Sequence, residues 1–206
     1  MALTTFAELK SSIADFLNRD DLTSVIPDFI TLAEADMNRN VRHWRQEART
    51  SQTIDAQYED LPSDFLEAVR YYVTSNDTSS LELISQGEML ERRERSLNTT
   101  GRPQYYAITA GQAEFYPTPD GAYTAELYYV QRITALSDSN TSNWVLQYYP
   151  DAYLYGALVH SAPYLADDNR TAVWSSLYQN AIGAINMESE KAKFGGSGRR
   201  MKIRSY

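Results

Sequence analysis

Apolar positions near the N-terminus recur at helical spacing. Thr5 followed by Glu8 has the form of a capping box and predicts a helix that begins there and ends near residues 18–21. A second helix is predicted to extend to about Arg49. It begins at Asp21 or Thr23, because Pro27 is tolerated only in the first turn of a helix. Its apolar stripe comprises Ile26, Phe29, Ile30, Ala33, Met37, Val41 and Trp44.

The middle of the chain, from about residue 51 to 134, has short alternating runs rich in Tyr, Thr, Gly and Pro, which are typical of strands. The clearest hairpin joins 105–108 to 112–116 through the turn signal Ala110-Gly111. A long strand is predicted over 122–133, and one short helix over 85–95.

Helical periodicity returns over 144–165 and again over 168–193, and Gly195-Gly196-Ser197-Gly198 follows as a flexible linker. Helices and strands therefore come in separate runs, which favours the α+β class. We expect a helical bundle from the N- and C-terminal helices with a β-rich insertion in the middle and a flexible C-terminal arm. The expected domains are 1–50 with 141–194 (helical bundle), 51–140 (β-rich insertion) and 195–206 (basic arm).

Charge is distributed unevenly along the 206 residues. The net charge is −8, yet the six basic residues after Glu190 lie in a stretch without acid, which leaves 13 basic against 27 acidic groups in residues 1–190. An acidic body repels a polyphosphate, so general nucleic-acid binding by the main surface is not expected. No apolar run approaches the roughly 20 residues of a membrane helix, so no membrane partner is expected.

The sequence contains little that points to catalysis. It has no cysteine, and His43 and His160 do not stand at metal-ligand spacing. The glycine-rich linker follows a helix, which does not suit a phosphate loop. We therefore expect no enzyme activity, catalytic residue, metal or cofactor. A hydrolase whose fold brings two acids together stays open as an alternative.

Two groups of residues suit protein contacts. Arg39, Arg42, Arg45 and Arg49 are three or four residues apart, which predicts one basic stripe on the second helix. The stripe is either a solvated face or a contact between subunits of a ring. The tyrosines of the β-rich section are either sheet filling or, where alternation turns them outward, contact residues.

Several motifs, in order, resemble the head–tail adaptor (connector) proteins of tailed bacteriophages. They are residues 26–42, 61–68, 101–108, 115–121 and 127–129, followed by Trp144 and residues 150–158. The likeness spans residues 5 to 190, and a more distant one is to tail tubular protein A.

This resemblance implies a structural virion protein at the head–tail junction, made in the host cytoplasm. It implies a ring, commonly of about twelve subunits, beneath the portal protein and above tail or nozzle proteins. DNA would pass through the channel of this ring without sequence-specific binding. The C-terminal segment would be the portal-binding arm, or would contact DNA at the channel mouth. The arm residues are Arg199, Arg200, Met201, Lys202, Ile203, Arg204 and Tyr206. Another tail-completion or fibre-attachment protein is the alternative.

Overall fold

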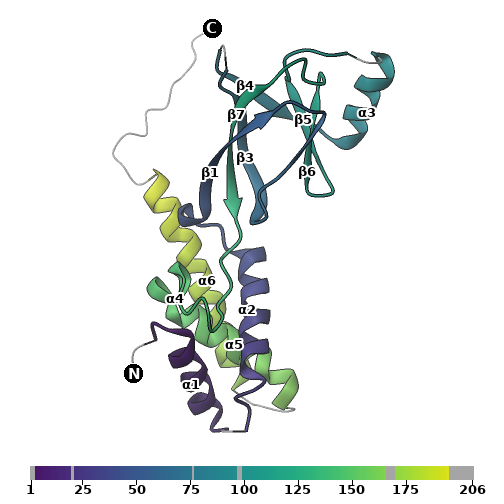
Figure 1. The fold of residues 1–206 in the computed structure, drawn as a ribbon. Coiled ribbons are helices and arrows are strands. Elements are labelled where there is room, and N and C mark those ends of the chain that lie inside the picture. Colours follow the sequence, from purple (N-terminus) through teal and green to yellow (C-terminus); the bar gives the residue numbers. More distant parts are fainter. Residues whose placement is uncertain (1–2, 20, 76, 97–98, 166–169, 195–206) are drawn as a thin grey trace. The chain divides into compact units, whose positions relative to one another are not determined.

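The computed structural model describes residues 3–19, 21–75, 77–96, 99–165 and 170–194, which divide into two compact units. Unit 1 comprises residues 1–46 and 133–206, and unit 2 comprises residues 47–132. The helices of unit 1 are α1 (Phe6–Leu17), α2 (Ile26–Asn40), a short 3-10 turn η1 (Trp44–Gln46), α4 (Trp144–Tyr148), α5 (Pro150–Leu165) and α6 (Thr171–Phe194) (Figure 1).

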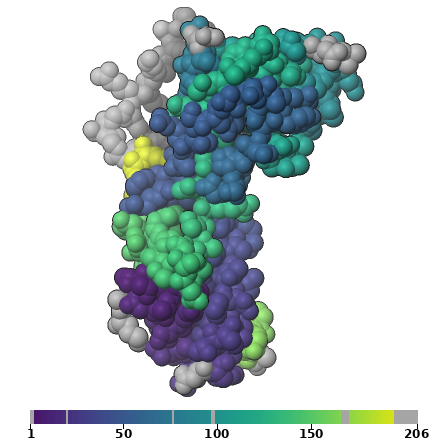
Figure 2. Space-filling model, in the orientation of Figure 1, coloured from purple at the N-terminus to yellow at the C-terminus, as the bar shows by residue number. Residues whose placement is uncertain are grey.

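The first helix begins where the capping box predicts. The Thr5 side chain accepts from the Glu8 backbone N–H at 3.3 Å, and the Glu8 carboxylate accepts from the Thr5 N–H at 3.0 Å. Asn18 ends the helix in the left-handed region with φ 54°. Side chains of α1 lie against the segment coloured green that includes α4 and α5 (Figure 2).

Helix α5 is the centre of unit 1, in contact with α1, α2, α4 and α6. It is apolar on several faces because neighbours surround it. Gly156 permits this packing, since a Cβ there would stand 3.0 Å from the Tyr178 ring and 3.1 Å from the Ala33 Cβ. Tyr149 precedes Pro150 with φ −137° and separates α4 from α5, so the single helix predicted over 144–165 is wrong.

Side chains fix the irregular segment 133–143 that re-enters unit 1. The buried Glu34 carboxylate accepts from the Leu136 N–H at 2.7 Å and from the Tyr153 hydroxyl at 2.9 Å. Asn143 donates to the same hydroxyl at 2.6 Å, and its own Oδ1 accepts from the Leu146 N–H as the N-cap of α4. The buried Leu136 N–H of this segment thereby has an acceptor inside the unit.

Unit 2 is built on one seven-stranded sheet in the order β1-β7-β3-β4-β5-β6-β2. Its strands are β1 (Glu47–Ile54), β2 (Tyr58–Asp60), β3 (Phe65–Val73), β4 (Ser79–Leu83), β5 (Tyr105–Thr109), β6 (Gln112–Tyr116) and β7 (Tyr123–Gln131). All pairings are antiparallel except β4 with β5. The sheet curls into a nearly closed barrel around Tyr71, whose buried ring meets Tyr106 and Phe115 edge-on at 5.3 and 5.5 Å.

Helix α3 (Gln86–Arg95) covers the outer face of β5 and β6. Arg93 of this helix holds the Glu114 carboxylate of β6, with Nε 2.7 Å from Oε1. Gln86 and Gln57 donate to the same carboxylate at 2.9 and 3.1 Å. A buried charge thus pairs with a nearby cation and two amides, as burial requires.

These observations correct the expected fold class. A helical bundle with a β-rich insertion is wrong, because the strands close nearly into a barrel with its own core. Alternation along the sequence reveals strands but not which strands pair, and β1 pairs with β7 from the far end of the unit. The second helix is also shorter than predicted: it ends at Asn40, and Val41 is extended.

Candidate interaction surfaces

The two histidines lie in unit 1. His43 is buried, stacks on Trp144 at 5.0 Å between ring centroids, and accepts from the Arg45 N–H through Nδ1 at 3.2 Å. Burial lowers the pKa of His43 and of His160, so both imidazoles are neutral near pH 7. Among the described residues, no three His, Cys, Asp or Glu side chains gather as a metal site.

No helix in the described ranges is both long and apolar enough to cross a membrane.

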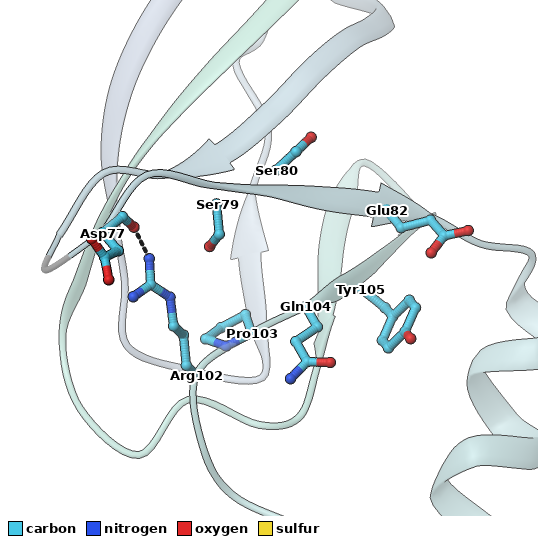
Figure 3. Close-up of a pocket in the computed structure, with 8 residues that line it drawn as sticks. All are labelled: Asp77, Ser79, Ser80, Glu82, Arg102, Pro103, Gln104 and Tyr105. Carbon is cyan, nitrogen blue, oxygen red and sulfur yellow. Dashed lines mark hydrogen bonds between the residues drawn. The ribbon is translucent and has the colours of Figure 1, made fainter. Parts of the chain in front are cut away.

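A shallow recess of about 510 Å³ lies between β4 and residues 102–105 (Figure 3). The β4–β5 ladder beside it is short, with Glu82 opposite Tyr105 and Leu83 opposite Tyr106, and the Gln104 N–H donates to the Tyr116 carbonyl oxygen of β6. Arg102 reaches across one end and donates to the Asp77 carbonyl oxygen. The lining contains two serines and the carboxyl residues Asp77 and Glu82, but no histidine, lysine or cysteine.

The four arginines predicted as one helical stripe do not lie on one helix. Only Arg39 belongs to α2, where it pairs with Asp36 at 3.1 Å. Arg42 follows the helix and donates to the Val41 carbonyl oxygen at 2.8 Å. Arg45 lies in η1, and Arg49 lies in β1 of unit 2. The prediction of one basic stripe is wrong because α2 ends at Asn40 and Val41 is extended.

Arg45 lies against two exposed aromatic rings and forms with them what we call the Trp44–Arg45–Tyr148 patch. Its guanidinium carbon is 4.5 Å from the Trp44 ring centroid and 4.1 Å from that of Tyr148. Trp44 is 40% exposed and Tyr148 55% exposed. The sequence marks Arg45 as a contact candidate, but only the fold brings Tyr148 of α4 against it.

A second aromatic and arginine surface occupies the outer face of β1, β7 and β3. The rings of Tyr72 and Tyr128 stack at 5.7 Å, and Arg49 stands 3.7 Å from the Glu126 carboxylate beside them. Hydrogen bonds from Tyr72 and Arg49 lower the pKa of Tyr128. The neighbours Tyr71 and Tyr129 are buried in the barrel, so alternation does turn one tyrosine of each pair outward.

The predicted portal-binding arm, residues 195–206, lies outside the described residues. Its residues and their role stay a prediction from the sequence.

The sequence model of one protein family, described as SU10 adaptor protein, matches residues 4–201 of the chain. No curated protein matches the chain.

Proposed function

The chain belongs to the SU10 adaptor protein family, and from this premise we propose that it forms the ring that joins the portal of a phage head to the tail. The family match also confirms the resemblance to phage adaptor proteins. The chain is thus a structural adaptor protein of a bacteriophage and a component of its virion. The match over nearly the whole chain is the observation that carries the proposal.

We propose a closed ring of about twelve copies beneath the portal, which extends the DNA channel. The charge of unit 2 supports the proposal of a channel that does not retain DNA, because the unit has 14 acidic against 7 basic residues. Negative walls repel phosphate and leave the duplex free to slide. No histidine, lysine or cysteine lines the recess beside β4, and no catalytic role is proposed.

The arm of residues 195–206 is proposed to bind the portal. Its arginines and lysine would pair with acidic portal residues as the segment orders on contact. Deleting residues 195–206 should abolish co-elution with the portal protein of the same phage while tryptophan fluorescence and circular dichroism stay unchanged. Retained co-elution with a loss of DNA binding would assign the arm to DNA instead.

We still propose contacts between neighbouring subunits at four arginines, although they do not lie on one helix: Arg39, Arg42, Arg45 and Arg49. The exposed rings beside Arg45 and Arg49 support this role, because Trp, Tyr and Arg are enriched where protein interfaces are strongest.

Immunogold labelling of virions tests the position directly. Gold at the junction between head and tail is expected. Gold at the tail tip or along fibres would instead support a tail-completion or fibre-attachment protein.

A further inference from the structure

The Trp44–Arg45–Tyr148 patch is held on a rigid base. The Trp44 N–H donates to the Ser189 hydroxyl of α6 at 3.0 Å, and the His43 N–H donates to the Gln46 side chain at 2.9 Å. The buried His43 ring packs between Trp44 and Trp144, with centroids 5.4 and 5.0 Å away. Such a surface loses little conformational entropy on binding.

The guanidinium of Arg45 lies close to both rings, with its carbon 4.5 and 4.1 Å from their centroids. Its Nε is buried without a hydrogen-bond partner among the described residues, while the side chain as a whole stays half-exposed. A planar guanidinium that is held by aromatic rings and still partly exposed can offer its terminal N–H groups to a partner, and that fork of donors matches a carboxylate.

We propose that the patch binds a carboxylate of a second copy of this chain, the next subunit of the ring. The chain itself supplies that chemistry, since the 14 acidic residues of unit 2 outnumber its 7 basic ones. A head-to-tail ring brings unlike surfaces of neighbours together, which suits a cation on one face and carboxylates on another. The inference rests on the proposed ring and names one of its contacts.

The test compares Arg45→Ala, Arg45→Lys and the control Arg19→Ala. Arg19 is another exposed arginine of unit 1, paired only with its neighbour Asp21 within the described contacts. Light scattering on dilution, with the portal protein of the same phage present and absent, gives the concentration of half-assembly. Arg45→Ala should raise it by about tenfold or more, and Arg19→Ala by less than about twofold. Arg45→Lys should fall between, since an ammonium keeps the charge and loses the planar fork.

The partner is identified by photo-crosslinking from Tyr148→p-benzoyl-phenylalanine in the assembled ring. Crosslinks between two copies of the chain support the proposal. The proposed contact is wrong if Tyr148 crosslinks only to the portal, or if Arg45→Ala assembles at the same concentration as the wild type. Either result leaves the proposed ring itself intact. If the wild-type chain forms no ring with or without portal, the proposed function fails and the inference falls with it. Unchanged circular dichroism and melting temperature show that each variant is folded.

Discussion

Replacing Glu34 with alanine removes the anchor of segment 133–143. The carboxylate is 5% exposed and accepts from two buried donors, the Leu136 N–H at 2.7 Å and the Tyr153 hydroxyl at 2.9 Å. Alanine leaves both donors without this acceptor. The segment that carries the chain back from unit 2 into the helical core should therefore loosen.

The size of the effect follows from the two lost contacts. A buried donor left unsatisfied costs about 1–3 kcal/mol, and the deleted side chain leaves a small cavity as well. Relief of the buried charge offsets part of this loss, because keeping a carboxylate away from water is itself unfavourable. We expect Glu34→Ala to lower the free energy of unfolding of unit 1 by about 2–4 kcal/mol. Glu34→Gln keeps an oxygen acceptor and should stay within about 1 kcal/mol of the wild type at pH 7.

Tryptophan fluorescence isolates this effect from the rest of the chain. Trp44, Trp144 and Trp174 are the only tryptophans, and all three belong to unit 1. Urea unfolding followed at tryptophan emission therefore reports on unit 1 alone. An Ala variant as stable as the wild type would refute the anchoring role of Glu34.

The pH dependence gives a second check. Burial raises the pKa of Glu34, opposed by the hydrogen bonds from Leu136 and Tyr153. The folded state therefore binds a proton that the unfolded chain has lost, and the contribution of this group to stability is present below the unfolded pKa of about 4.3 and declines as pH rises through the raised value. The stability of the wild type relative to Glu34→Gln should thus decrease as the pH rises from about 4.3 through the raised pKa of Glu34. A difference that stays flat, or that rises with pH, contradicts the argument.

Other substitutions probe the packing of each unit. Gly156→Ala should destabilise unit 1 by about 1–3 kcal/mol by tryptophan fluorescence, because the new Cβ meets the Tyr178 ring at 3.0 Å. Gly183→Ala is its control: α6 has open space there, so about 0.5–1 kcal/mol of stabilisation is expected, and equal losses at both sites would contradict the steric account. Glu114→Gln should destabilise unit 2 by about 2–4 kcal/mol, seen as faster hydrogen exchange in β5 and β6, since it leaves the Arg93 guanidinium without its charged partner. Although burial opposes it, hydrogen bonding holds the pKa of Glu114 below its ordinary value, so this contribution is present at neutral pH and lost on acidification; exchange that stays equally slow in wild type and variant would argue against it.

Local signals in the sequence predicted local structure well. The capping box of Thr5 and Glu8 marks the start of α1 because its hydrogen bonds join residues three apart. The hairpin of β5 and β6 was predicted from Ala110-Gly111, and both residues have positive φ, 51° and 83°. Ser85 caps α3 where the short helix was predicted. Each of these depends on neighbours along the chain.

Signals that depend on distant partners were missed. The apolar spacing continues through Val41 and Trp44, yet Val41 is buried in an extended conformation and the Trp44 N–H bonds to α6, so periodicity overestimated the length of α2. Barrel closure requires β1 to pair with β7, which no local pattern encodes. The patch at Arg45 depends on Tyr148, which is distant from Arg45 in the sequence.

Native mass spectrometry of the chain mixed with the portal protein of the same phage tests the central claim most directly. The account predicts a complex whose mass equals the portal ring plus one fixed, integral number of 23.4 kDa subunits, about twelve, over a range of mixing ratios. Portal rings that carry no subunits, or a number of subunits that varies continuously with the ratio, would contradict a closed adaptor ring.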